Sequence, residues 1–139
     1  MTELKFLLNF LWATLGVVLG AFLGGLNGLL VALLFFMGID YVTGVLSAIK
    51  AHSLSSNVGF WGLIRKGCIL LVVGLSNLLD VYVLDGEGMA RNATTLFYIS
   101  NEGISILENM VELGLKVPNK IKRILAELQE SDEDDNEMD

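Results

Sequence analysis

The feature that most constrains this chain is an uncharged run of 34 residues, from Phe6 to Ile39. As one helix it would extend about 51 Å at ~1.5 Å per residue, well beyond the ~30 Å hydrocarbon core of a bilayer. One straight span is therefore excluded unless it is strongly tilted. The glycines and asparagine of Gly24–Gly28 permit positive φ angles, so we expect a turn there. This predicts one spanning helix near residues 6–23 and a second near residues 29–49.

The composition also indicates a membrane protein, because 53% of the residues are hydrophobic and only 18% are charged. The formal net charge of -7 is misleading, since eight of the sixteen acidic residues lie between Glu127 and Asp139. The remainder is close to neutral and offers no large basic surface, which argues against nucleic-acid binding. The only cysteine, Cys68, excludes an internal disulfide and a CxxC metal or redox motif.

Two further apolar stretches follow, near residues 67–84 and 93–111, and the polar residues between Lys50 and Arg65 indicate an interhelical loop. Polar residues interrupt the stretch 93–111, so it either packs inside a bundle or lies at the membrane interface. We predict an all-α integral membrane protein with a transmembrane domain at residues 1–113. Four spans are favoured, with three as the alternative.

The C-terminal region is expected to contain two parts. Residues 114–129 alternate apolar and basic positions in a pattern that predicts an amphipathic helix on the cytoplasmic side. Residues 130–139 are acidic, have no apolar period and predict a disordered tail. Anionic lipid headgroups are the expected ligands of the basic side chains of the helix, which are Lys116, Lys120, Lys122 and Arg123.

The distribution of positive charge predicts the topology. Positive residues favour the cytoplasmic side of a membrane. Four spans with a cytoplasmic N-terminus place the C-terminus in the cytoplasm as well. In this arrangement Lys50, Arg65 and Lys66 are topology anchors at the cytoplasmic surface. Whether Arg65 or Lys66 also pairs with Asp40 is not decided by the sequence.

Small residues mark two surfaces for helix association. Gly16, Gly20 and Gly24 recur at four-residue spacing and share one helical face, and Gly44 lies one turn after Asp40. Glycine faces let helices approach closely in lipid, where packing drives association. The alternative is that glycine is simply frequent in membrane helices.

Four polar residues lie within or beside apolar stretches: Asp40, Glu102, Ser105 and Asn109. A charge at the centre of a spanning helix costs about 2.5 to 3.5 kcal/mol, so such a residue is expected to be neutral, paired or exposed to water. We predict a role in assembly or in lining a pore. The alternatives are a position at a helix end for Asp40 and an interfacial helix for the other three.

No catalytic or cofactor motif is present. His52 is the only histidine, which excludes a His-pair metal site, and the chain contains neither a Walker loop nor GxGxxG. We therefore expect no enzymatic activity, no metal and no cofactor.

Two segments resemble a known family. The first is DYVTGVLSAIK from Asp40, followed by SSNVGF and GLIRK, and the second is NEGISILENM from Asn101, followed by GLKVPNK. Together they resemble the phage-lysis and toxin-secretion holin family over about residues 38–128. The resemblance implies a phage protein that accumulates in the bacterial cytoplasmic membrane and oligomerises into lesions. A cytoplasmic endolysin, or an exported toxin, then leaves through these lesions without binding the holin directly.

Two other functions fit the same pattern. A small proton-coupled transporter would also combine short spans with intramembrane carboxylates. A membrane scaffold would present the C-terminal helix to a cytoplasmic partner. Many relatives in the family end in a basic tail, whereas this chain ends in an acidic one, so the resemblance assigns no role to the tail.

Overall fold

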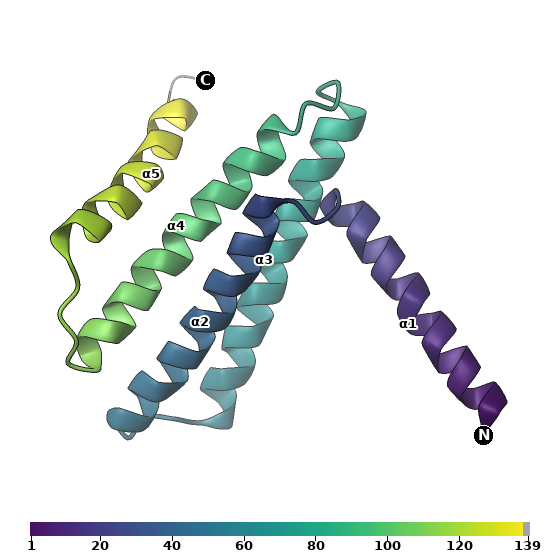
Figure 1. The fold of residues 1–139 in the computed structure, drawn as a ribbon. Helices are drawn as coiled ribbons and strands as arrows, with labels where there is room; N and C mark the ends of the chain where they lie inside the picture. Colours follow the sequence, from purple (N-terminus) through teal and green to yellow (C-terminus); the bar gives the residue numbers. More distant parts are fainter. Residues whose placement is uncertain (138–139) are drawn as a thin grey trace.

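The computed structural model describes the backbone of residues 1–137, which forms five helices without a strand (Figure 1). This confirms the prediction of an all-α protein. The helices follow one another in the order α1 Thr2–Leu23, α2 Gly28–Lys50, α3 Ser56–Tyr82, α4 Met89–Glu112 and α5 Asn119–Glu137. Three of them, α1, α2 and α3, are long and apolar enough to cross a membrane.

Helix α1 projects away from the other helices and meets them only near its C-terminal end (Figure 1). None of its residues is buried. It ends where the sequence predicts a turn, because Gly24 and Gly25 adopt left-handed conformations with φ angles of 79° and 81°. The side chain of Asn27 then accepts a hydrogen bond from the Leu30 amide at 2.9 Å and caps α2. The predicted turn is therefore confirmed, with one helix ending before it and another starting at its end.

Helices α2, α3 and α4 form a bundle in which successive helices run in opposite directions (Figure 1). Its apolar core takes residues from all three helices: Leu30, Leu33, Met37, Ile69, Val73 and Ile99. The side chain of Tyr41 brings α2 close to α3, because a Cβ added at Gly59 would lie 3.3 Å from its hydroxyl. Glycine thus makes room for an aromatic ring between two helices.

Helix α3 starts at Ser56, so the prediction of a loop from Lys50 to Arg65 was wrong over most of its length. The Ser55 side chain accepts a hydrogen bond from the Val58 amide at 3.2 Å and so caps the helix. Polar residues that suggested a loop are therefore the start of a helix. The 27 residues of α3 extend about 40 Å at ~1.5 Å per residue, which leaves a polar first turn beyond a bilayer core.

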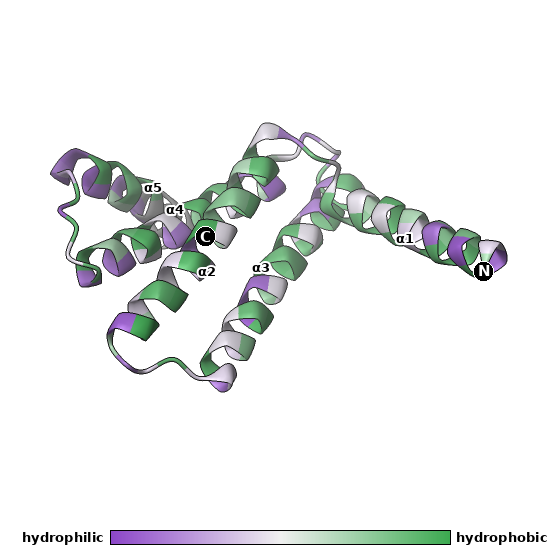
Figure 2. Cartoon of the chain, turned by 60° about the horizontal axis from the view of Figure 1, so that its bottom comes forward, coloured by the Kyte–Doolittle hydropathy of each residue, from purple (hydrophilic) through white to green (hydrophobic). Residues whose placement is uncertain are grey.

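Helix α4 has the length of a spanning helix but is more polar than α1, α2 and α3 (Figure 2). It packs along α2 and also contacts α3. Its helical structure confirms the element predicted near residues 93–111. A fourth membrane crossing stays a prediction, since composition alone does not place α4 among the candidate spans.

Helix α5 folds back beside α4, after a connection in which Gly114 has a φ angle of 91°. Of the α5 side chains that the structure describes, that of Leu125 is buried. The predicted disorder of residues 130–139 is corrected for residues 130–137, which are helical. A missing apolar period argues against packing, but it does not prevent an acidic segment from continuing a helix that has already formed. Residues 138 and 139 lie outside the described part.

Candidate functional site

The buried face of α2 changes from apolar to polar halfway along the helix. Leu30, Leu33 and Met37 belong to the apolar core, whereas the next turns of the same face bury Thr43 and Ser47. These positions follow the three- and four-residue spacing of one helical face. Asp40 lies at the change, where α2 faces both α3 and α4.

Lys66 binds two carboxylates from neighbouring helices at this point. Its ammonium group lies 2.7 Å from Oδ2 of Asp40 and also forms an ion pair with Glu102. The side chains of Lys66, Asp40 and Glu102 are 12%, 15% and 9% exposed, respectively. Each of α2, α3 and α4 contributes one member, so this ion cluster joins the three helices. Removing one member of such a group would leave the opposite charge without a partner, which is strongly destabilising.

Asn109 completes the surroundings of the ion cluster. Its side-chain amide donates hydrogen bonds to Oδ1 of Asp40 at 3.2 Å and to Oγ1 of Thr43 at 3.0 Å. The two carboxylate oxygens of Asp40 therefore have different partners, one an ammonium and the other an amide. Gly44 lies beside this contact, where an added Cβ would be in ordinary van der Waals contact with the Asn109 amide nitrogen, at 3.5 Å.

A second polar contact joins α2 and α4 at the far end of both helices. The Ser47 hydroxyl donates a hydrogen bond to the Glu112 carboxylate, and the Lys50 ammonium donates one to the Glu112 carbonyl oxygen at 2.8 Å. Lys50 is the last residue of α2, and its role as a topology anchor stays a prediction. Its pairing with α4 was not predicted.

A pocket of about 580 Å³ lies beside the ion cluster, between α2, α3 and α4. Asp40, Lys66 and Glu102 line it together with Arg65 and Ser105. Polar groups inside a membrane bundle usually face one another or a water-filled space. The pocket gives the ion cluster such a space, and Asn109 lines it as well.

A polar clamp at the opposite end of the bundle was not recognised from the sequence. Gly88, the residue before α4, has no side chain to cap the helix, and Asp80 of α3 does so instead. Its carboxylate accepts hydrogen bonds from the backbone amides of Ala90 at 2.9 Å and Arg91 at 2.7 Å. Asp80 is 2% exposed. An acidic residue near the end of an apolar stretch was the available signal.

The same clamp fastens the end of α1. The Arg91 guanidinium donates a hydrogen bond to the Gly24 carbonyl oxygen at 2.6 Å, and the Asn77 amide donates one to that of Phe22 at 3.0 Å. The ring of Phe22 lies against Gly74, where an added Cβ would overlap it. These contacts hold the last turn of α1, while Gly16 and Gly20 have no atom within 4 Å of an added Cβ.

The predicted site residues thus fall into three groups. Asp40, Glu102 and Asn109 lie together in one cluster, and Ser105 lines the adjoining pocket. Lys66 is not at the end of a helix, as an anchor would be, because α3 begins ten residues before it. The remaining charged candidates are exposed, and they are Arg65, Lys116, Lys120, Lys122 and Arg123. The role of Arg65 as a topology anchor and the contacts of the other four residues with lipid headgroups stay predictions.

Comparison with known proteins identifies the family. The bacteriophage holin family model matches residues 17–130, a range that includes the ion cluster and the polar clamp. The chain belongs to this family. The resemblance inferred from the two sequence segments is thereby confirmed, and with it a membrane protein whose apolar helices cross the bilayer more than once.

Relatives of this holin-family chain occur in phages and bacteria. A probable holin of Bacillus phage phi105 is 39% identical over 101 residues, which cover 73% of this chain and 74% of the relative. An uncharacterised 14.9 kDa protein in the nagH 3′ region of Clostridium perfringens is 44% identical over 99 residues, covering 71% of this chain and 75% of the relative. No solved structure matches the chain.

Proposed function

We propose that this protein assembles in the bacterial cytoplasmic membrane into lesions that release an endolysin, or an exported toxin, and so trigger lysis. The observation that carries the proposal is the match to the holin family over residues 17–130. The relative from Bacillus phage phi105, a probable holin, supports it. The protein itself would act by assembly, without a catalytic step and without contact with the released enzyme.

Four spans agree best with the contacts between α2 and α4. Arg91 of α4 binds the backbone at Gly24, just before α2, and Glu112 binds Ser47 and Lys50 at its other end. Two helices tied at both ends cover the same depth, so α4 crosses the membrane wherever α2 does. Glu102 and Asn109 of α4 are tolerated because they face the ion cluster rather than lipid.

In the proposed topology the N-terminus and the loop after Lys50 lie in the cytoplasm. The basic residues of α5 follow the cytoplasmic end of α4, where they contact anionic headgroups before assembly. The polar clamp around Asp80 and Arg91 then lies at the outer surface. This arrangement keeps almost all positive residues on the cytoplasmic side.

Assembly would use the surface that one chain leaves open. At Gly16 and Gly20 of α1 an added Cβ would meet no atom of the described residues within 4 Å, and small residues support close helix contacts between copies. Cooperative association of many copies gives a delay followed by sudden lesion formation. In the assembled state the pocket beside Asp40 and Glu102 provides a route by which water reaches buried polar groups.

The test is induced expression in bacteria with and without a co-expressed cytoplasmic endolysin, with culture density and membrane potential followed together. We expect an abrupt loss of potential after a silent delay, and lysis only when endolysin is present. Normal growth with an intact potential would contradict the proposal. That outcome would favour the transporter or the scaffold.

A further inference from the structure

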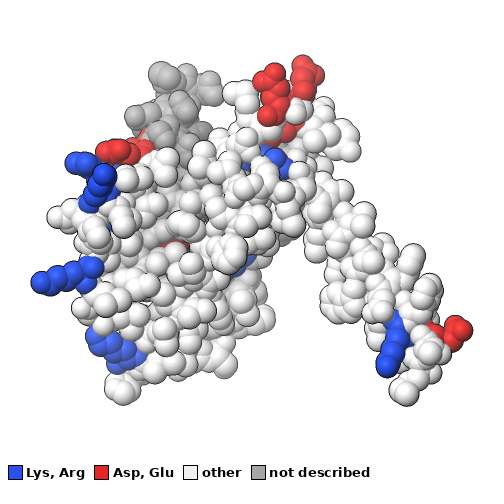
Figure 3. Space-filling model, in the orientation of Figure 1, with Lys and Arg blue, Asp and Glu red and all other residues white. Residues whose placement is uncertain are grey.

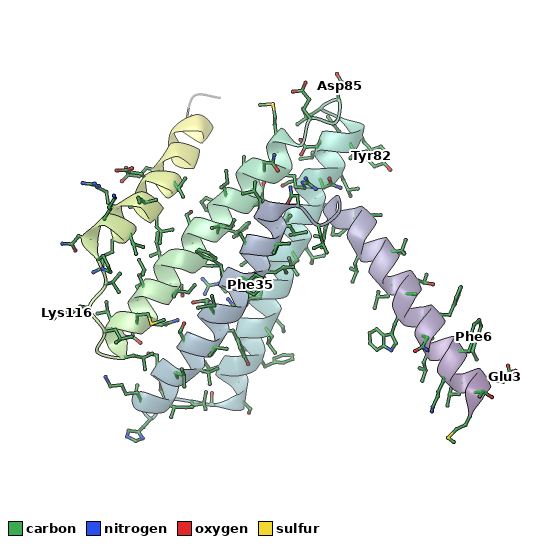
Figure 4. All side chains as sticks on the ribbon, in the orientation of Figure 1. Glu3, Phe6, Phe35, Tyr82, Asp85 and Lys116 are labelled. Carbon is green, nitrogen blue, oxygen red and sulfur yellow. The ribbon has the colours of Figure 1, made fainter. Side chains whose placement is uncertain are left out.

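The outer surface of α5 differs from the outer surfaces of the other helices. Basic and acidic side chains gather on α5 at one side of the molecule (Figure 3), where Arg123 and Glu127 form an exposed ion pair at 3.7 Å. Lys120 and Lys122 are also exposed. The exposed residues of α2 at comparable positions, including Phe35 and Val42, are apolar (Figure 4).

The inner surface of α5 is attached near the middle of α4. Leu125 is buried there and packs on Gly103, since a Cβ added at Gly103 would lie 3.0 Å from both Leu125 methyl groups. Phe36 of α2 meets the same position at 3.1 Å. Gly103 directly follows Glu102 of the ion cluster. The contact therefore places α5 at the depth of the ion cluster, midway along the bundle.

Lipid solvates the charged outer surface of α5 poorly at this depth. Charged side chains are strongly disfavoured in the hydrocarbon region unless they are paired, reach an interface or face water. The Arg123–Glu127 pair is 72% and 66% exposed at its two side chains, and Lys122 adds another charge to the same surface. The outer faces of α1 and α2 have no comparable group of charges along their apolar parts, and α3 has the single exposed charge of Arg65 beside the ion cluster.

We propose that in the lesion α5 is packed on α4, as in this structure, and that these two helices form the wall facing the water-filled passage. The charged surface of α5 then contacts water, and the apolar surfaces of α1, α2 and α3 contact lipid. This inference rests on the proposed lesion-forming function. It assigns to the basic residues of α5 a role in the assembled state that differs from contact with lipid headgroups.

The first test fixes α5 to α4. A Gly103→Cys/Leu125→Cys variant, made with Cys68→Ser, is oxidised to join the two introduced thiols. The full chain is placed in vesicles of phosphatidylglycerol and phosphatidylethanolamine that contain a fluorescent dye. We expect the locked protein to release dye within about twofold of the rate of the same protein after reduction. The single variants, Gly103→Cys and Leu125→Cys, control for oxidation without a lock.

Loss of dye release on oxidation, with recovery on reduction, would overturn the inference, because it would mean that α5 leaves α4 when the lesion forms. If neither the reduced variant nor the parent protein releases dye, the lesion-forming function itself fails. The two failures are therefore distinguishable.

The second test asks which surface meets water. Lys122→Cys on α5 and Val42→Cys on α2 lie close to the level of the ion cluster, so they form a matched pair. Each is introduced into the locked, dye-releasing protein and treated with a charged maleimide. We expect labelling of Lys122→Cys to be at least tenfold faster than labelling of Val42→Cys. Equal rates, or faster labelling on α2, would overturn the assignment of the α4 and α5 wall.

Discussion

Helix α1 and the bundle of α2, α3 and α4 use their residues in opposite ways. Helix α1 is apolar around its circumference, yet none of its residues is buried. The bundle buries Glu102, Asp80 and Asn77 and half-buries Asp40 and Lys66 at the contacts between its helices. Lipid solvates apolar side chains as well as a protein core does, so apolar residues alone do not hold membrane helices together. Paired polar groups supply the specific contacts.

The bundle is layered along its length as a result. The ion cluster lies on one side of the apolar core and the polar clamp on the other. Helix α1 takes part only in the clamp, through its last turn. Figure 4 shows the free part of α1, where Glu3 and Phe6 lie far from Tyr82 and Asp85 at the clamped end of α3.

The largest expected effect comes from removing the cation shared by two carboxylates. Lys66→Met leaves Asp40 and Glu102 without their ammonium partner, and breaking a buried ion pair costs about 3 to 5 kcal/mol. We expect a loss of this size in the free energy of unfolding, measured by denaturant titration in detergent micelles. Lys5→Met on α1 is the matched control, with a change below about 0.5 kcal/mol. Equal effects of the two substitutions would contradict the contrast between the bundle and α1.

The polar clamp is expected to be next. Asp80→Asn keeps the shape of the side chain but removes the charge that accepts hydrogen bonds from Ala90 and Arg91. Hydrogen bonds to charged groups contribute about 1.5 to 3 kcal/mol, and we expect a destabilisation in that range. Hydrogen exchange of the first turn of α4 should increase as well. Glu87→Gln in the exposed turn provides the control, and a similar loss there would show that charge alone is responsible.

Two glycine substitutions should have opposite signs. Gly74→Ala pushes a methyl group into the ring of Phe22, and overpacking of this kind costs about 1 to 3 kcal/mol. Gly20→Ala meets no atom within 4 Å and should stabilise α1 by about 0.5 to 1 kcal/mol, because alanine favours the helix. Distances between spin labels on α1 and α3 should broaden only with Gly74→Ala. If both substitutions changed the stability in the same direction, that result would argue against the attachment of α1 at one end only.

The last substitution, Gly20→Leu, separates folding from assembly. No described atom lies within 4 Å of a Cβ added at this position, so the free energy of unfolding should rise by no more than the about 0.5 to 1 kcal/mol expected of Gly20→Ala. Assembly should nevertheless be slower, because a large side chain blocks close contact between copies. The loss of membrane potential after induction should then come later than with Val17→Leu, which alters a neighbouring face. Unchanged timing would remove α1 from the assembly surface.

Local sequence determined the elements that depend on neighbouring residues. The uncharged run and its glycine turn specified α1 and α2, and the two motifs indicated the family. The start of α3 was misplaced because serine and asparagine favour both loops and helix caps, and the structure shows that Ser55 caps a helix here.

The tertiary structure alone decided which polar groups meet. Lys66 lies 26 residues from Asp40 and 36 from Glu102, and Asn109 lies 69 from Asp40. Hydropathy shows that such residues need partners in a membrane, but it does not choose the partners. That choice depends on how each helix rotates and how far it slides against the others. The same holds for α5, whose apolar face could cover a membrane surface or a protein helix, and which the fold places on Gly103.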